Sequence, residues 1–372
     1  MSAHRKSGQG LNRQLVAGRG MAGGTVAWMN GSAEEKTVLV TGGSGFLGGW
    51  CAVELLRRGY AVRTTVRDLA REPEVRARIE SEVGAVGDRL TFFAADLSED
   101  DGWERAVQGC DHVLHVASPF PPVQPEDPDE LIVPAREGTL RVLRAALDAG
   151  VRRVVVTSSV AAVGGSTAHA DAPLTEADWT DLDNPKLTPY TRSKTIAERA
   201  AWDLVAERGE REKLAVVNPG AILGPVLGAE DSTSLELVAR LLKGMPGTPR
   251  IGFSVVDVRD VADLQIRAMT AVEAGGERFV AVAQFQWMAE VAAVLRERLG
   301  ADAAKVPKRA VPDLFVKAMG RFDPGIRSIV GQLGRKVEMS SEKARSLLGW
   351  SPRPVEETIV DCARSLVDEK VG

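Results

Sequence analysis

The sequence is poor in the residues that build metal sites and disulfide frameworks. Its 372 residues include only three cysteines and four histidines. Cys51, Cys110 and Cys362 lie far apart without a CxxC pair, so we expect reduced thiols in a cytoplasmic protein and no metal site. No apolar run reaches the roughly 18 residues that a membrane-spanning helix requires. A formal net charge of −4 gives no electrostatic reason to expect nucleic acid or an anionic membrane as a partner.

Apolar residues are plentiful, and only the start of the chain departs from this composition. Hydrophobic residues make up 44% of the sequence, enough for one large or two smaller domains. Residues 1–33 are rich in Gly and carry basic but no acidic side chains. They also lack the apolar segment of a secretory signal. We expect a disordered N-terminal extension, or a translation start placed too early with Met21 or Met29 as the true one; a basic transit-like extension is the alternative.

A glycine-rich turn joins a short strand to a helix. Residues 38–41 form an apolar, β-branched run typical of a buried strand. Gly42, Gly45 and Gly48 follow, and apolar residues then recur every four positions until Gly59, which predicts a helix that ends there. A flexible turn would explain the glycines alone. In this context, however, they favour a dinucleotide site, because they allow a tight turn, approach of the pyrophosphate and close packing of helix on strand.

The end of the next predicted strand bears on the choice of dinucleotide. Residues 60–66 form a second β-branched run, followed by Arg67 and Asp68. Arg67 lies 19 residues beyond Gly48, where such a unit meets the adenosine ribose. An acidic residue there would accept from the 2′-hydroxyl of NAD, whereas an arginine accommodates the 2′-phosphate of NADP. Arg67 therefore favours NADP, Asp68 is the competing signal, and both side chains could simply be solvated.

Strands and helices continue to alternate up to residue 219. Strands are predicted over 90–95, 112–116, 153–157 and 214–218, with a helix over 129–148 and a proline-rich loop over 119–128. Ligands of an open parallel sheet bind outside the carboxyl ends of its strands. Residues that follow these strands are therefore candidates for cofactor contacts, namely Asp96, Leu97, Val116, Ala117, Ser118, Pro219 and Gly220. Asp96 could instead cap the next helix, and His115, inside a strand, is expected to be a hydrogen-bonded core residue.

Beyond residue 219 the regular alternation breaks. Helices are predicted around 235–242, over 261–271 with Asp260 as cap, over 287–299, up to Leu348 and over 355–368, and a strand over 277–283. We therefore predict an α/β protein with a doubly wound parallel Rossmann sheet and a smaller, discontinuous C-terminal α/β substrate-binding region. The expected division is a disordered extension (1–33), a nucleotide-binding domain (34–219 plus about 253–283) and a substrate-binding region (220–252 and 284–372).

A serine pair and a tyrosine–lysine pair are the candidate catalytic groups. Ser158 and Ser159 follow the predicted strand 153–157. Tyr190 and Lys194 are four residues apart in a predicted helix, so they share one of its faces. A phenol with a pKa of ~10 is a poor acid–base group at neutral pH, and a neighbouring ammonium would lower that pKa.

These motifs together resemble the extended short-chain dehydrogenase/reductases, over residues 36–370. The likeness is strongest to the dihydroflavonol reductase-like and NADPH-dependent aldehyde and ketone reductases. It rests on the glycine turn, on Val62–Asp68, on His115–Pro119, on Tyr190–Lys194 and on Asn218–Gly220. The resemblance implies that Ser159, Tyr190 and Lys194 are catalytic, with hydride transfer from NADPH to a carbonyl carbon. The cofactor residues are then Thr41, Gly42, Gly45, Phe46, Leu47, Gly48, Arg67, Asp96, Leu97, Val116, Ala117, Ser118, Tyr190, Lys194, Pro219 and Gly220.

Departures from the family pattern limit the substrate. Val163 stands where plant dihydroflavonol reductases carry asparagine, and the Cys-containing signature of cinnamoyl-CoA reductases is missing. Both absences favour a general aldehyde or ketone reductase acting on a small-molecule carbonyl, as a monomer or homodimer. Gln265 stands where relatives often have histidine and is expected on a helix surface. The alternatives are a nucleotide-sugar epimerase or dehydratase, a 3β-hydroxysteroid dehydrogenase, and a non-catalytic NADP-binding regulator.

Overall fold

The computed structural model describes residues 36–119, 125, 127–165, 172–228 and 233–368. The expected N-terminal extension, and residues 120–124 and 126 of the proline-rich loop, lie outside the described residues. The described residues form a single compact unit.

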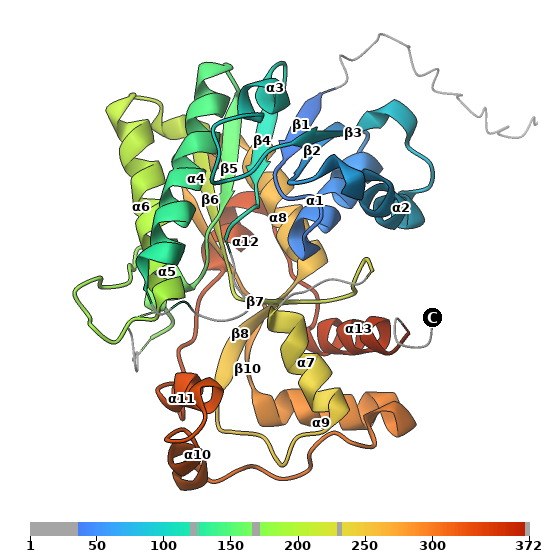
Figure 1. Ribbon diagram of the computed structural model, residues 1–372, viewed down its shortest axis with the longest axis vertical. Helices are drawn as coiled ribbons and strands as arrows, with labels where there is room; N and C mark the ends of the chain where they lie inside the picture. Colours follow the sequence, from blue (N-terminus) through green and yellow to red (C-terminus); the bar gives the residue numbers. More distant parts are fainter. Residues whose placement is uncertain (1–35, 120–124, 126, 166–171, 229–232, 369–372) are drawn as a thin grey trace, which may run out of the picture. The chain divides into compact units, whose positions relative to one another are not determined.

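A seven-stranded parallel sheet organises this unit (Figure 1). Its interior strands are short apolar runs because helices cover both faces of the sheet. The strand order is β3-β2-β1-β4-β5-β6-β9, which confirms the doubly wound parallel sheet. The strands are β1 (Thr37–Val40), β2 (Ala61–Val66), β3 (Leu90–Ala94), β4 (His112–His115), β5 (Arg153–Thr157), β6 (Leu214–Pro219) and β9 (Arg278–Ala281).

Alternate residues of each strand pack against different helix layers. Val38 and Val40 join one apolar core, and Leu39 between them joins the other. The first core includes α1 (Phe46–Arg57), α2 (Glu72–Val83) and α8 (Val258–Thr270); the second includes α3 (Trp103–Val107), α4 (Asp129–Asp148) and α6 (Pro189–Glu207). Figure 1 shows α4 and α6 side by side on one face of the sheet and α1 beside α8 on the other.

The chain reverses its direction across the sheet between β1 and β4. It runs outward from β1 through β2 to β3, and then returns to place β4 on the other side of β1. The loops that follow β1 and β4 therefore diverge, which leaves a crevice at the carboxyl edge of the sheet.

A three-stranded sheet forms the second part of the unit, with strand order β10-β8-β7. Its strands are β7 (Ala221–Leu223), β8 (Gly252–Asp257) and β10 (Gln284–Trp287). The helices α5 (Ala161–Gly164), α7 (Thr233–Lys243), α9 (Met288–Leu299), α10 (Asp313–Met319), α11 (Pro324–Val330), α12 (Glu342–Leu348) and α13 (Val355–Asp368) complete the described helices, with short 3₁₀ turns at Leu69–Arg71, Gly87–Arg89, Arg211–Lys213, Val272–Ala274 and Gly300–Ala303.

The strand β8 was expected in the nucleotide-binding part, within residues 253–283, and instead pairs with β7 and β10. The apolar pair Val255–Val256 suits a buried strand in either sheet, so the sequence pattern does not choose between them. Gly220 allows this pairing: a Cβ there would lie 2.2 Å from the carbonyl oxygen of Ser254, so only glycine lets the chain pass so close to β8.

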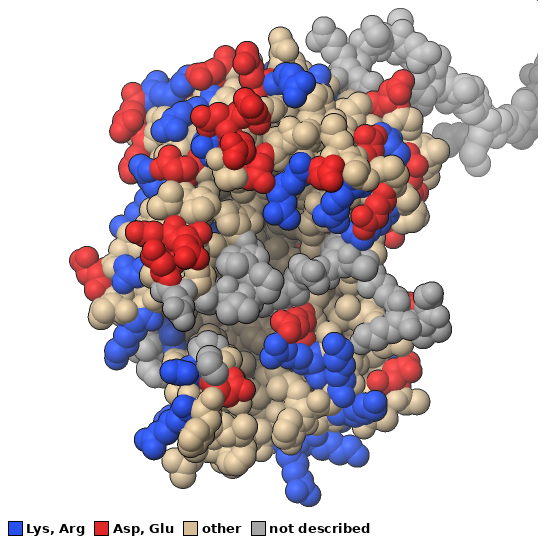
Figure 2. Space-filling view, viewed as in Figure 1, with Lys and Arg blue, Asp and Glu red and all other residues tan. Residues whose placement is uncertain are grey.

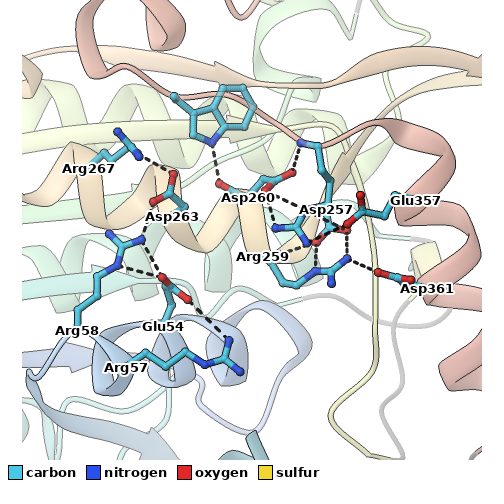
Figure 3. Close-up of polar contacts among 12 residues, drawn as sticks. Glu54, Arg57, Arg58, Asp257, Arg259, Asp260, Asp263, Arg267, Glu357 and Asp361 are labelled. Carbon is cyan, nitrogen blue, oxygen red and sulfur yellow. Dashed lines mark hydrogen bonds and ion pairs between the residues drawn. The ribbon is translucent and has the colours of Figure 1, made fainter. Parts of the chain in front are cut away.

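Ion pairs join α8 to the C-terminal segment (Figure 3). The Asp257 carboxylate accepts from the backbone N–H of Arg259 at 2.9 Å, so α8 begins three residues earlier than the cap predicted at Asp260. The Arg259 guanidinium bridges Asp257 and Asp361 of α13, at 2.8 and 2.7 Å. Asp260 instead accepts from the backbone and side chain of Arg353 at 2.8 and 3.0 Å. These contacts fix α13 against the helix that covers the large sheet.

Candidate active site

Thr41 joins the two loops that border the crevice. Its hydroxyl oxygen accepts from the backbone N–H groups of Val116 and Ala117 at 3.0 and 2.9 Å. The single hydroxyl proton is therefore available to the Nδ1 atom of His115, 2.9 Å away. His115 is thus a neutral ring with its own proton on Nε2. Burial and the charge of Lys194 lower the pKa of His115 to about 3, which agrees with the predicted core role of this residue.

Two glycines of the turn differ in the space around them. A Cβ at Gly48 would lie 2.1 Å from the carbonyl oxygen of Gly42, so this glycine is needed for α1 to pack on the turn. A Cβ at Gly45 would meet only that same oxygen, at an ordinary 3.4 Å. Gly45 also caps α1 without a side-chain hydrogen bond, and the first turn of α1 carries no acidic residue. The backbone N–H groups at this helix end are therefore open to an anion such as a pyrophosphate.

Arg67 lies exposed at the end of β2. The competing residue, Asp68, turns its carboxylate to the backbone N–H of Ala70 at 2.9 Å, where it begins a 3₁₀ turn. Asp96, after the adjacent strand β3, accepts from the backbone and hydroxyl of Ser98 at 2.8 and 2.6 Å. These hydrogen bonds, and secondarily the charge of Arg67, lower the pKa of Asp96. The guanidinium of Arg67 is therefore the group at this strand end that suits a phosphate.

The other predicted cofactor residues also follow carboxyl ends of the parallel strands. The sheet places these ends along one edge, as the topology predicts. At that edge lie Phe46 and Leu47 at the start of α1, Leu97 after β3, Ser118 after β4, and Pro219 with Gly220 at the end of β6.

Ser159 and Tyr190 are brought together at the same edge. Ser159 is nearly buried, and its hydroxyl accepts from the backbone N–H of Ala161 at 3.1 Å. Tyr190 is half-buried at the start of α6, where the Thr188 hydroxyl caps the helix. Burial raises the pKa of the Tyr190 phenol, and its hydrogen bond with Ser159 opposes that rise. Lys194 was expected to lower the pKa of Tyr190, but it is not among the groups that shift this pKa.

Lys194 lies one turn farther along α6 and is buried. Burial lowers the pKa of its ammonium to about 8, against the favourable charge of Glu198. Lys194 also lines a cavity of about 10 Å³ with polar groups of His115, Ser118 and Ser158. That volume is at the lower limit for a single water molecule.

A buried polar network beneath Lys194 was not predicted. The Glu198 carboxylate accepts from the hydroxyl of Ser158 at 2.5 Å and the amide of Asn218 at 2.7 Å. It also accepts from the guanidinium of Arg278 at 2.5 Å. Ser158 is thereby committed to Glu198, which supports the choice of Ser159 as the serine that faces a substrate. The available sequence signal was a carboxylate four residues after Lys194, on the same helix face.

Gln265 was expected on a helix surface, and this expectation is wrong. The residue is fully buried, and its side-chain amide donates to the Thr157 hydroxyl at 2.6 Å. The helix α8 lies between the large sheet, α1 and α12, so a much larger part of its surface is buried than its amphipathic pattern suggests.

A larger cavity, of about 660 Å³, borders α6 and is lined by Trp179, Trp202 and Arg278, among others. It contains neither Ser159 nor Tyr190, so we do not assign it to the substrate. Within the described ranges, no group of three His, Cys, Asp or Glu residues could hold a metal ion. No described helix is both long and apolar enough to cross a membrane.

The fold and the site define a dinucleotide-binding α/β enzyme with a serine, tyrosine and lysine at the carboxyl edge of its sheet. The chain belongs to the NAD dependent epimerase/dehydratase family, whose model matches residues 38–282. Within that superfamily it is an NAD(P)-dependent reductase. The resemblance to reductases drawn from the motifs is confirmed.

Named relatives are plant and yeast reductases. Cinnamoyl-CoA reductase CAD2 of Medicago truncatula is 34% identical over 349 residues, which cover 92% of this chain and 99% of that protein. Dihydroflavonol 4-reductase of Zea mays is 33% identical over 328 residues, covering 85% and 84%. The crystal structure of yeast methylglyoxal/isovaleraldehyde reductase Gre2 with NADPH superposes with a TM-score of 0.74, at 26% identity over 90% of this chain and 99% of that one.

Proposed function

We propose that this protein is an NADPH-dependent carbonyl reductase that converts an aldehyde or ketone to an alcohol. The observation that carries the proposal is the hydrogen-bonded pair of Ser159 and Tyr190 at the carboxyl edge of the sheet, with the buried Lys194 one helical turn away. The solved structure of Gre2 with NADPH, together with the family match, supports the cofactor.

The cofactor contacts follow from the described geometry. The open helix end at Gly45 would receive the pyrophosphate, and the exposed guanidinium of Arg67 would bind the 2′-phosphate. Lys194 would bind the nicotinamide ribose. When bound, NADPH supplies the hydride that is added to the carbonyl carbon.

The side chains of the chain handle the carbonyl oxygen. Ser159 donates a hydrogen bond to this oxygen and positions it beside Tyr190. Tyr190 then transfers its phenolic proton to the oxygen as the carbonyl is reduced. Burial favours the protonated phenol, which is the form that a proton donor requires. The hydrogen bond with Ser159, which lowers the pKa of the phenol, favours the phenolate that remains.

The C-terminal segments supply the substrate-binding region in this proposal, together with β8, which pairs with β7 and β10. Next to Ser159, an apolar cluster includes Val160, Val163, Leu174, Val282 and Met339.

A thioester of coenzyme A is a second candidate substrate. The segment 305–336 carries eight Lys and Arg against two Asp. Figure 2 shows Lys and Arg gathered over the lower part of the molecule, where α9 and α10 lie. Such a surface attracts a polyanionic substrate, and several relatives are named cinnamoyl-CoA reductases. This observation restores a substrate class that the missing Cys-containing signature disfavoured.

The substitution Tyr190→Phe tests the function. It removes the phenolic proton but leaves the ring and the helix, so we expect carbonyl reduction to fall by about 10²–10⁴-fold. The measurement is NADPH oxidation with aldehydes, ketones, dihydroflavonols, nucleotide sugars and an aromatic acyl-CoA. NADPH binding, followed by fluorescence titration, should change little. Turnover that is unchanged in the variant would overturn the assigned role of Tyr190.

A further inference from the structure

Glu198 lies at the centre of the catalytic region but reaches neither the substrate edge nor solvent. The residue is 1% exposed and points from α6 toward the ends of three strands. Its Oε2 atom accepts from Ser158 after β5 and from Asn218 of β6. Its Oε1 atom accepts from Arg278 of β9 and, weakly, from Trp202 at 3.4 Å. One carboxylate therefore joins the catalytic helix to β5, β6 and β9.

Arg278 extends this junction to the segment that precedes α6. Its guanidinium donates to the carbonyl oxygens of Glu176 and Asp178 at 2.8 and 3.0 Å. It also stacks on Trp179, with 3.7 Å between Cζ and the ring centroid. The next residue, Thr180, is buried and donates to the carbonyl oxygen of Ala161 at 2.6 Å. The network thus returns to the backbone two residues beyond Ser159.

Asn218 closes the same network from the other side. Its side-chain amide donates both to Glu198 and to the carbonyl oxygen of Ser159, at 2.7 and 3.2 Å. The backbone of the proposed catalytic serine is therefore held by a group that Glu198 itself orients. A shift of the carboxylate would be transmitted to Ser159 through one side chain.

The charge of Glu198 also faces Lys194, one turn earlier on α6. The titratable and charged groups around Lys194 are Glu198 and Tyr190 on α6 and His115 of β4, with Arg278 of β9 behind the carboxylate. His115 is a neutral ring and Tyr190 a neutral phenol, so Glu198 is the anion next to this ammonium. A nearby anion favours the charged form of a buried ammonium and so opposes the fall in pKa that burial causes.

We propose that the Glu198–Arg278 pair positions the catalytic site. It fixes Ser159 relative to the start of α6, and it supplies the negative charge that Lys194 faces. The proposal rests on the reductase function proposed above. Glu198 acts through Ser158, Asn218 and Lys194 and is a positioning residue, because it touches no reacting group.

Two substitutions at one position separate charge from shape. Glu198→Gln keeps the length of the side chain and removes its charge. The pKa of Lys194 should then fall, since the favourable anion is lost while the cation of Arg278 stays. The basic limb of the pH profile of kcat/KM for the carbonyl, measured at saturating NADPH, should therefore move by about one unit to lower pH. At pH values above the limb, this shift is a roughly tenfold loss of activity. Glu198→Asp keeps the charge and shortens the reach, so it should lower the melting temperature and leave the limb within about half a unit.

Arg278→Gln should shift the pKa of Lys194 in the opposite direction. Without its guanidinium, Glu198 presents its full charge to Lys194, so the basic limb should move to higher pH. This variant keeps the inference testable if Glu198→Gln does not fold. Asp148→Asn is the matched control, because it removes an exposed ion pair between Asp148 and Arg208, which are 2.8 Å apart. Arg208 lies at the other end of α6 from the catalytic site. Its pH profile and kcat/KM should equal those of the wild type.

A direct measurement of the pKa of Lys194 distinguishes failure of this inference from failure of the proposed function. The pKa of Lys194 is measured by NMR on ¹³C-lysine-labelled protein without cofactor, with the resonance assigned by its loss in Lys194→Arg. If the wild type reduces no carbonyl, the proposed function fails, and the NMR titration still decides the role of Glu198. An unchanged Lys194 titration in Glu198→Gln, with only a lower melting temperature, would reduce the pair to a structural role and overturn the inference.

Discussion

At the scale of single residues, hydrogen-bond partners separate two adjacent serines. Ser158 donates to the buried carboxylate of Glu198, so its hydroxyl is not available to a substrate. Ser159 accepts from the backbone N–H of Ala161 and hydrogen-bonds the Tyr190 phenol, so its hydroxyl lies beside the proposed proton donor. The position of both serines after a predicted strand followed from the sequence. The side-chain partners, Glu198 and Tyr190, both lie on α6, which meets the two serines only through the fold.

Glu198 and Gln265 show why part of the site could not be predicted. Each is a polar residue within an amphipathic helix pattern, and such residues usually face solvent. Both are buried because their helices lie against the sheet where strand-end polar groups need partners. Local periodicity assigns a residue to a helix face, but it does not show which polar groups of distant strands that face will meet.

Arg67 carries the prediction for cofactor choice. Arg67→Ala removes the guanidinium that we assign to the 2′-phosphate, which NADH lacks. A hydrogen bond to a charged group contributes about 1.5–3 kcal/mol, so the Kd for NADPH should rise by about 10–100-fold. The Kd for NADH, measured by the same fluorescence titration, is the internal control and should stay nearly unchanged. Equal losses for both cofactors would contradict the phosphate assignment.

At the scale of elements, the strands and helices that border the site match the predicted ranges closely. The helix predicted over 129–148 is α4 with the same bounds, and β5 likewise matches 153–157. Long periodic segments and continuous apolar runs specify these elements locally. The strands β7 and β10 were missed because they span only three and four residues and depend on pairing with β8.

The glycine turn before α1 offers a matched pair of substitutions. Gly48→Ala would press a methyl group against the backbone of Gly42 and should lower the free energy of unfolding by about 1–3 kcal/mol. Gly45→Ala has room and a negative φ of −94°, so its stability should change by only about 0.5 kcal/mol. Its methyl group would instead occupy the space of the pyrophosphate, and the Kd for NADPH should rise about tenfold or more.

Chemical denaturation and NADPH titration of both variants check this pair. Gly48→Ala should mainly lower stability, and Gly45→Ala should mainly weaken NADPH binding. A Gly45→Ala protein that binds NADPH like the wild type would show that the pyrophosphate does not approach this turn.

At the scale of the whole molecule, two sheets share one continuous apolar core. The core that packs α1 and α8 on the large sheet continues through Val255 and Val256 of β8 to α9 and α13. The sequence predicted a nucleotide-binding and a substrate-binding part, but sequence patterns do not show that their apolar faces merge. The ion pairs of Asp257, Arg259 and Asp361 reinforce the same junction.

The last prediction concerns the residues before this unit. In the part of the chain that the structure describes, the first contacts are at Lys36 and Thr37: the carbonyl oxygen of Lys36 accepts from Ala61, and the N–H of Thr37 donates to the Asp111 carboxylate at 3.0 Å. Deletion of residues 1–33 removes none of these contacts. The shortened protein should therefore keep the melting temperature, the Kd for NADPH and the carbonyl-reduction rate of the full chain, as calorimetry and steady-state kinetics would measure. A fall in the melting temperature or in the rate would show that the N-terminal segment contributes to the folded unit or its site.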